Sequence, residues 1–230
     1  MIAVKNISRK FKEKNVLIDI SFDIEPNKVT SIISPNGMGK TTLISIIANL
    51  LYPDSGKVIF DDNISNHDIF PILSGEKNLY AKNTVYENVI YSSILRGLKK
   101  REIEENIAKY SKWFPLYESI KNKVVEELSF GQKRLTSIFS GIVSEAKCFL
   151  LDEPTEGLDL EHKEQLKQII ISLKQERTII LTSHDHEFLA SVSDKNLFLL
   201  NGKIAEEKDV LLFDELLDIY RKLYKAEDIE

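Results

Sequence analysis

The chain has 230 residues, with 31 lysines and arginines against 36 aspartates and glutamates, and a formal net charge of −5. This length suits one α/β domain that carries a small subdomain, and it excludes two domains of equal size. The acidic balance offers no basic face for sequence-independent binding to DNA or RNA, so we expect no nucleic-acid partner.

The location of the protein is predicted from its cysteine and its apolar runs. Cys148 is the only cysteine and lies in an apolar run, which indicates a small buried side chain in a reducing compartment. No apolar run approaches the roughly 18 to 20 residues that span a bilayer, and residues 1–5 lack the pattern of a signal peptide. We therefore expect a cytoplasmic protein that is peripheral to the inner face of the cell membrane and reaches it through a membrane partner.

The first part of the chain has the pattern of short β-strands separated by polar turns. This pattern predicts antiparallel strands that lead into a buried strand, with Phe11 in the first turn. A helix is expected from Lys40 to about Leu51. The expected strands lie at 2–7, 16–24, 29–33 and 57–61.

The hydrophobic pattern changes twice in the rest of the chain. Residues 84–143 carry apolar residues at spacings of three and four, which predicts an inserted helical subdomain. From Cys148 the pattern alternates between strand and helix, which favours a parallel α/β core with crossover helices. The expected elements are strands at 148–152, 178–182 and 197–204, and helices at 160–174 and 187–192.

The tail predicts one amphipathic helix. Residues 210–224 place an apolar stripe on a single helical face, made of Phe213, Leu216, Leu217, Tyr220 and Leu223. We expect this helix to dock at the edge of the core, and a partner-binding helix is the alternative. The chain then forms one domain, 1–230, with a core lobe from about 1–83 and 145–209, a helical subdomain from about 84–144 and a C-terminal helix from about 210–230.

A phosphate-binding loop is predicted in SIISPNGMGKTTL at 31–43. Gly37 and Gly39 allow the backbone N–H groups to turn inward, and the N-terminus of the following helix adds its positive dipole end. Lys40 would reach the β- and γ-phosphates, and Thr41 would hold Mg²⁺. Ser34 occupies the position of the first glycine in the pattern G-x-x-x-x-G-K-[ST]. Because Ser34 precedes Pro35, we expect an extended backbone there, which does not require glycine. A strand-turn-helix corner without ligand is the alternative.

A second motif, CFLLDEPTEGLD at 148–159, ends an apolar strand with two adjacent carboxylates. The carboxyl ends of strands are where α/β sheets hold ligands. Asp152 suits Mg²⁺, and Glu153 suits general base catalysis on water. The alternative is an ordinary strand end, with Asp159 as a helix cap.

These motifs carry a resemblance to a known family. The phosphate loop, LSFGQKR at 128–134, DEPTEGLD at 152–159 and Ser183-His184 resemble, in order and approximate spacing, the motifs of ATP-binding cassette (ABC) ATPases. The resemblance implies an α/β fold with a P-loop NTPase core, a mostly parallel sheet, an N-terminal antiparallel β-subdomain and an inserted helical subdomain. It implies ATP and Mg²⁺ as ligands. By the same resemblance, the catalytic residues are Lys40, Glu153 and His184, the metal ligands are Thr41 and Asp152, and the nucleotide-binding residues are Phe11, Asn36, Gly37, Met38, Gly39, Lys40, Thr41, Thr42, Ser129, Gly131, Gln132 and Asp159.

The family pattern also implies roles for residues outside the phosphate loop. Phe11 matches the aromatic residue that stacks on adenine, and His184 matches the histidine that orients water and the γ-phosphate. Ser129 and Gly131 match residues that contact the γ-phosphate held by the opposite subunit of a dimer. Asp159 matches a carboxylate that communicates between the two sites. Locally, Ser129 and Gln132 also form the pattern of a helix capping box.

Two further positions depart from the family pattern. Phe130 replaces the usual glycine of the signature, and Gly75 aligns with a glutamine that reaches Mg²⁺ in the family. Glu76 could substitute for that glutamine through water. The pair His184 and His186 does not predict a zinc site, because two imidazoles on a short loop lack a third ligand nearby.

The function expected from the resemblance is that of a transporter's nucleotide-binding subunit, exporter-like in the stretch 79–88. Two ATP-binding subunits, identical or homologous, would sandwich ATP and drive a separate membrane-spanning subunit. The residues from Gly75 to Tyr91, with Tyr80 and Tyr86, form the candidate surface for that subunit. The alternatives are a soluble ABC ATPase without a membrane partner, and an ATP-gated dimerisation module with very weak hydrolysis.

Overall fold

A six-stranded sheet forms the centre of the computed structural model, which describes residues 1–61, 64–75 and 78–224. The strand order is β5-β6-β7-β3-β8-β9, and all neighbouring pairs are parallel except β8 and β9. The central strands β3, β6 and β7 are buried throughout, as expected for a parallel sheet covered on both faces. The strands are β3 (Val29–Ile33), β5 (Ile69–Ile72), β6 (Cys148–Leu151), β7 (Thr178–Thr182), β8 (Lys195–Leu200) and β9 (Lys203–Lys208).

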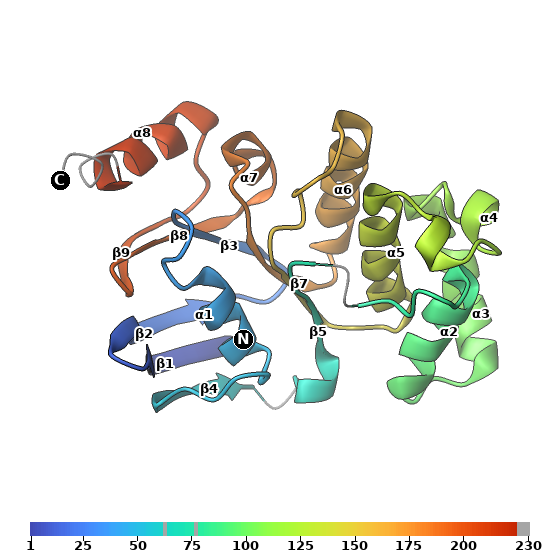
Figure 1. Cartoon of the computed structure of the whole chain (residues 1–230), viewed down its shortest axis with the longest axis horizontal. Helices are drawn as coiled ribbons and strands as arrows, with labels where there is room; N and C mark the ends of the chain where they lie inside the picture. The colour runs from blue at the N-terminus through green and yellow to red at the C-terminus, as the bar shows by residue number, and fades with distance from the viewer. Residues whose placement is uncertain (62–63, 76–77, 225–230) are drawn as a thin grey trace.

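A second sheet, antiparallel and three-stranded, lies at the lower left of Figure 1. Its order is β2-β1-β4, with β1 (Ile2–Phe11), β2 (Lys14–Ile24) and β4 (Ser55–Phe60). Helix α1 (Lys40–Ile47) shares one apolar cluster with β1 and β2, which includes Leu43, Ile44 and Ile47. The antiparallel N-terminal sheet and the parallel core were both predicted, and both are confirmed.

The helices between residues 84 and 143 lie at the right side of Figure 1. Thr84 caps the first of them, accepting a hydrogen bond from the backbone N–H of Glu87 at 3.2 Å, so the helix begins where a capping box allows it. The helices are α2 (Val85–Leu95), α3 (Lys100–Tyr110), α4 (Tyr117–Ile120) and α5 (Phe130–Val143), and the 3₁₀ turns are Asn66–Asp68, Ser111–Trp113 and Val125–Glu127.

Four local expectations were wrong. Phe11 ends β1 and does not lie in the turn. The helix expected to reach Leu51 ends at Ile47, because Asn49 adopts a left-handed φ of 57°. The run at 197–204 is a hairpin, β8 and β9, since Asn201 and Gly202 both have positive φ and form its turn. Strand β5 was not predicted.

Three helices complete the core: α6 (Leu160–Leu173), α7 (His186–Val192) and α8 (Phe213–Tyr224). Helix α8 lies against α7 and β8 and buries Leu216 and Tyr224. Phe213, expected on its docking face, is 42% exposed. Among the described residues, no helix is long and apolar enough to cross a membrane.

Candidate functional site

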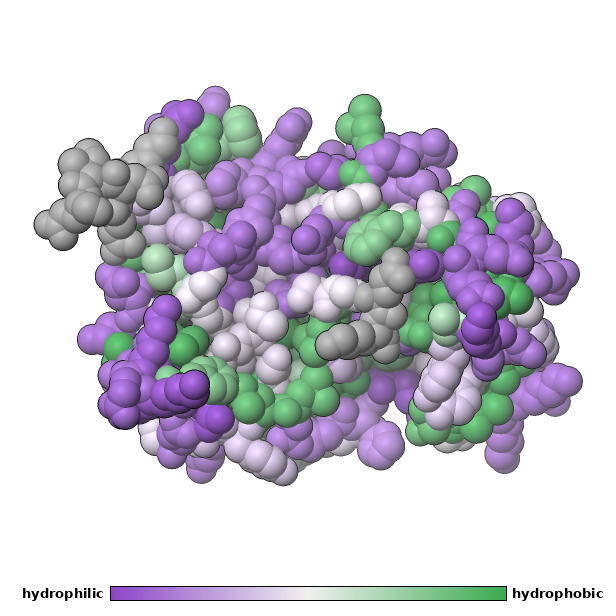
Figure 2. All heavy atoms as spheres, in the orientation of Figure 1, coloured by the Kyte–Doolittle hydropathy of each residue, from purple (hydrophilic) through white to green (hydrophobic). Residues whose placement is uncertain are grey.

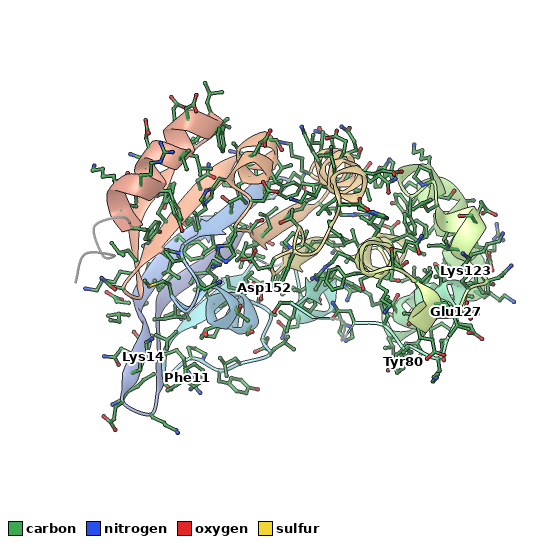
Figure 3. The ribbon with its side chains drawn as sticks, turned by 45° about the horizontal axis from the view of Figure 1, so that its top comes forward. Phe11, Lys14, Tyr80, Lys123, Glu127 and Asp152 are labelled. Carbon is green, nitrogen blue, oxygen red and sulfur yellow. The ribbon has the colours of Figure 1, made fainter. Side chains whose placement is uncertain are left out.

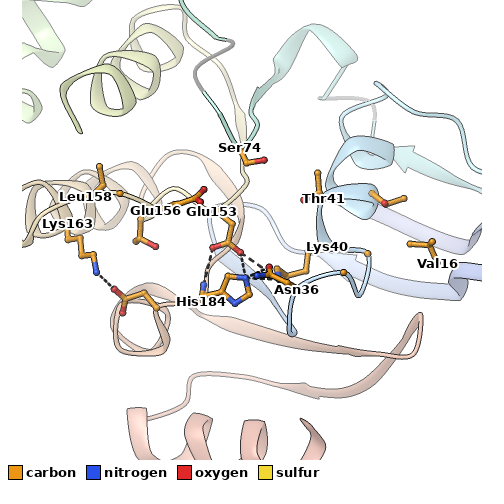
Figure 4. A pocket seen from close by; sticks show the side chains of 16 residues that line it. Val16, Asn36, Lys40, Thr41, Ser74, Glu153, Glu156, Leu158, Lys163 and His184 are labelled. Atoms are coloured by element: carbon orange, nitrogen blue, oxygen red, sulfur yellow. Dashed lines mark hydrogen bonds and ion pairs between the residues drawn. The ribbon is translucent and has the colours of Figure 1, made fainter. Parts of the chain in front are cut away.

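A cleft of about 820 Å³ opens where the parallel strands end. Strands β3, β6 and β7 finish at the same edge of the sheet and are followed by Ser34, Asp152 and Ser183, respectively. Figure 4 shows the side chains of Asn36, Lys40, Glu153 and His184 converging in this cleft. Sequence segments more than 140 residues apart therefore meet at one place.

The backbone of the phosphate loop adopts the conformation that its glycines allow. Gly37 and Gly39 have φ of 79° and 102°, where an L side chain would be strained. A Cβ added at Gly39 would also lie 2.9 Å from Cγ1 of Val16. Ser34 is not among the residues with positive φ, so its backbone does not require a glycine.

The ammonium group of Lys40 is held inside the loop. Its Nζ donates to the carbonyl oxygens of Ser34 at 2.8 Å and Pro35 at 3.3 Å, and it lies 3.7 Å from Oε1 of Glu153. The side chain is 6% exposed. Burial lowers the pKa of Lys40, while Glu153 and Asp152 act in the opposite direction. An ammonium so placed is available to a phosphate group that enters the cleft.

Thr41 and Asp152 form an oxygen-only pair beside the N-terminus of α1. Thr41 Oγ1 donates to Oδ2 of Asp152 at 2.8 Å, and Thr182 Oγ1 donates to Oδ1 at 2.8 Å. Mg²⁺ prefers oxygen ligands and is commonly bound by one or two carboxylates together with substrate phosphates and water. The pair fits Mg²⁺. No group of three histidine, cysteine, aspartate or glutamate side chains that could hold a metal occurs within residues 1–61, 64–75 and 78–224.

Glu153 and His184 face each other across the cleft. His184 donates its backbone N–H to Oε2 of Glu153 at 3.1 Å, and its Nε2 lies 3.2 Å from Oε1. Burial raises the pKa of Glu153, against the opposing charge of Lys40. Burial and then the charge of Lys40 lower the pKa of His184. Nε2 of His184 also lies 2.7 Å from Oδ1 of Asn36, which links this loop to the phosphate loop.

Several residues assigned by resemblance lie outside the cleft. Ser129 caps α5 by accepting from the backbone N–H of Gln132 at 3.2 Å, and exposed Asp159 caps α6 by accepting from that of His162 at 2.8 Å. The predicted capping box at Ser129 is present. Phe11 lies at the hairpin of β1 and β2, distant in Figure 3 from Asp152, and it is not among the described residues that line the cleft.

The cleft contains residues that sequence reasoning missed. Val16 of β2 lines it beside Gly39, and Ser74 also lines it; Figure 4 shows Val16 at the right and Ser74 at the top of the view. Lys163, which pairs with Asp185 at 2.7 Å, lines the cleft as well. The position of Val16 carried a weak signal, since it begins an apolar strand; Ser74 and Lys163 carried none.

The comparisons with known proteins decide the family. Residues 17–156 match the family model described as ABC transporter. The chain belongs to this family. Its fold, with the P-loop core, the separate antiparallel sheet and the helices, was predicted and is that of ABC ATPase domains.

Relatives within the ABC family are moderately similar. A putative ABC transporter ATP-binding protein of Clostridium perfringens (strain 13 / Type A) is 30% identical over 217 residues, which are 90% of this chain and 38% of that protein. The chain thus spans well under half the length of this curated relative. A solved ATP-binding cassette of an ABC transporter, in its ADP conformation, has a TM-score of 0.85 and 25% identity, covering 100% of this chain and 99% of the other.

Two other similar solved structures belong to an assembly, a transporter complex in one case and a dimer in the other. One is cbiO1 from Clostridium perfringens, part of the ABC transporter complex cbiONQ, with a TM-score of 0.80, 25% identity, and coverage of 99% of this chain and 91% of the other. The other is a dimeric ATP-binding cassette in a post-hydrolysis state bound to ADP and Pi, with a TM-score of 0.80, 24% identity, and coverage of 92% and 99%. The second similarity, below 25% identity, concerns the fold alone.

Proposed function

We propose that this chain is the nucleotide-binding subunit of a transporter, which binds and hydrolyses Mg-ATP in a dimer and drives a separate membrane subunit. One observation carries the proposal: Lys40, Glu153 and His184 converge within 4 Å of one another beside the Thr41–Asp152 pair. A cation for phosphate, a base for water and an oxygen pair for Mg²⁺ are the parts that ATP hydrolysis needs.

The catalytic residues of the cleft have separate roles in the proposed hydrolysis. Lys40 and the N-terminus of α1 bind the β- and γ-phosphates, and Thr41 and Asp152 hold Mg²⁺, which neutralises phosphate charge when bound. Glu153 accepts the proton of the attacking water; its raised pKa makes it a stronger base than an exposed carboxylate. His184 orients the water and the γ-phosphate from the neighbouring loop.

The second subunit of the proposed dimer supplies Ser129, Gly131 and Asp159 to this cleft. Ser129 and Asp159 are exposed in the chain and lie outside its own cleft, which supports a role towards another copy or a homologue. The unusual Phe130 is accommodated internally, because its ring lies 3.0 Å from where a Cβ on Gly157 would be. The aromatic ring therefore packs on its own chain, and Ser129 beside it is an exposed residue.

A groove between the core and α2 is proposed as the surface for the membrane subunit, placing the chain at the cytoplasmic face of the membrane. It has a volume of about 430 Å³ and is lined by Phe70, Tyr80 and Tyr91 among others. Ile94 and Leu95 are more than half exposed nearby, and Figure 2 shows apolar side chains gathered at the lower right, over α2. An apolar face of this kind suits a helix of a partner protein.

The segment at Gly75 favours a second candidate, an ATP-gated dimerisation module with weak hydrolysis. Gly75 has φ +91° and no side chain to offer to Mg²⁺, and Ser74 lines the cleft instead. Glu76, proposed as a substitute ligand, lies outside the described residues. Turnover by the purified protein separates the two candidates.

The arrangement of the chain supports one functional domain. We propose a core lobe of about 1–83 and 145–209, a helical subdomain of about 84–144 and a C-terminal helix of about 210–230, because α2 to α5 leave the core after β5 and return to it at β6.

The proposed function is tested by steady-state hydrolysis of Mg-ATP by the purified chain, with Lys40→Ala as the inactive control. We expect turnover that disappears in the control. Turnover that is equal in both proteins, or none in wild-type protein that binds ATP, would remove hydrolysis from the proposal.

A further inference from the structure

The last helix of the chain contacts the strand that carries the phosphate loop. The hydroxyl of Tyr224, in α8, lies 2.9 Å from the carbonyl oxygen of Ile33 and 3.0 Å from that of Leu199, within donor distance of both. Tyr224 is 5% exposed, so these bonds are made in the interior. Ile33 is the last residue of β3, and Ser34 of the phosphate loop follows it directly.

The same helix contacts the loop that carries His184. The ring of Tyr220 lies 4.3 Å from that of His186, centroid to centroid, and 4.7 Å from that of Tyr224. His186 is the first residue of α7 and lies two residues after His184. The two tyrosines thus form one aromatic pair that contacts the residue before the phosphate loop and the helix that follows His184.

None of the residues of α8 lines the cleft itself. Ser34 and His184 both contact Lys40 directly, at 2.8 Å and 3.3 Å. A shift of either segment would therefore change the surroundings of the ammonium group. Helix α8 contacts Ile33, which precedes Ser34, and His186, which follows His184, so any influence on the cleft through these contacts is indirect.

We propose that Tyr224 and Tyr220 are positioning residues for the nucleotide site. Tyr224 fixes the start of the phosphate loop through the carbonyl of Ile33, and Tyr220 fixes His184 through His186. A loop that is already ordered binds its ligand without a further entropic cost, so Tyr224 acts on nucleotide affinity. The position of His184 relative to Glu153 matters for the reaction, so Tyr220 acts on turnover. The second half of this proposal rests on the proposed function.

The test uses point variants of the full chain, because removing α8 would also expose the buried side chain of Leu216. Tyr224→Phe keeps the ring and removes the hydroxyl. Tyr220→Leu removes the ring contact with His186. Tyr110→Phe is the matched control: it loses a buried hydroxyl on α3 that donates to Glu145 at 2.8 Å, and Tyr110 is not among the described residues that line the cleft.

The first readout is amide hydrogen exchange in the nucleotide-free protein. One hydrogen bond of this kind is worth a factor of roughly two to ten. We expect Tyr224→Phe to accelerate amide exchange in residues 34–43 by about that factor. The affinity for a non-hydrolysable ATP analogue should fall by the same factor, and Tyr110→Phe should change neither the exchange rate nor the affinity. Equal exchange and affinity in Tyr224→Phe and the control would overturn the role of Tyr224.

The second readout is steady-state kinetics, which shows whether a variant changes kcat or KM for ATP. We expect Tyr220→Leu to lower kcat by roughly three- to tenfold with KM for ATP within about a factor of two. An unchanged kcat, or an equal loss in the Tyr110→Phe control, would overturn the role of Tyr220. Failure of the proposed function is distinguishable, because it abolishes turnover in the wild type and leaves the exchange and affinity comparison intact.

Discussion

Nζ of Lys40 lies 3.7 Å from Oε1 of Glu153, and the two side chains are 6% and 15% exposed. Burial lowers the pKa of Lys40 and raises the pKa of Glu153. The negative charge of Glu153 opposes the first shift, and the positive charge of Lys40 opposes the second. The phosphate site and the proposed base are therefore coupled electrostatically.

Lys40→Ala should abolish ATP binding. The triphosphate loses the compact cation that the loop carbonyls of Ser34 and Pro35 hold in place, and the helix N-terminus alone does not replace it. Isothermal calorimetry measures the change. Nucleotide affinity equal to that of the wild type would contradict the assignment of the loop.

Ser34→Gly should change ATP affinity by less than a factor of about ten. Ser34 has no positive φ, so glycine relieves no strain there. The carbonyl that accepts from Lys40 is a backbone group and remains in the variant. A much larger gain in affinity would show that the serine side chain obstructs the cleft.

The pH dependence of turnover should report the raised pKa of Glu153. The carboxylate acts as a base only when it is deprotonated, so activity falls as the pH drops through a pKa above the ordinary value of 4.5. The same shift means that Glu153 contributes most to stability at low pH and loses that contribution as the pH rises through its folded-state pKa. The acid loss of turnover is therefore not caused by unfolding through this group.

This pH prediction is checked by kcat/KM between pH 4 and 8, with circular dichroism as a control for folding. A profile that stays flat from pH 8 down to pH 4.5 in folded protein would contradict it.

The phosphate loop and the carboxylates at 152–153 could be predicted because each is a contiguous motif that follows an apolar strand. Strand β5 could not be predicted, because it has only four residues and contains Pro71, which is unfavourable inside a sheet. The proline is tolerated because β5 is an edge strand. The contact between Tyr224 and Ile33 spans 191 residues, and no local pattern encodes it. Val16 enters the cleft because β2 lies beside Gly39, which is a property of packing.

Gly75→Gln should leave ATP affinity nearly unchanged and raise basal turnover, if a missing amide limits the positioning of Mg²⁺. The backbone φ of +91° makes any L residue strained there, so Gly75→Ala is the matched control for that strain. Turnover of the glutamine variant relative to the alanine variant isolates the amide. No difference between the two would show that the amide has no role at this position.

Glu153→Gln should stop hydrolysis without preventing ATP binding, because an amide preserves the shape of the site and cannot accept the proton of the attacking water. Removal of a general base typically costs about 10² to 10⁴ in rate, so ATP should bind and remain bound.

The decisive measurement is the mass of Glu153→Gln by light scattering with Mg-ATP, with ADP, and with Ser129→Arg added. We expect a dimer with Mg-ATP alone and a monomer in the other two cases, since ATP would bridge Lys40 of one subunit and Ser129 of the other. A dimer that forms equally without nucleotide, or hydrolysis by Glu153→Gln at the wild-type rate, would contradict it.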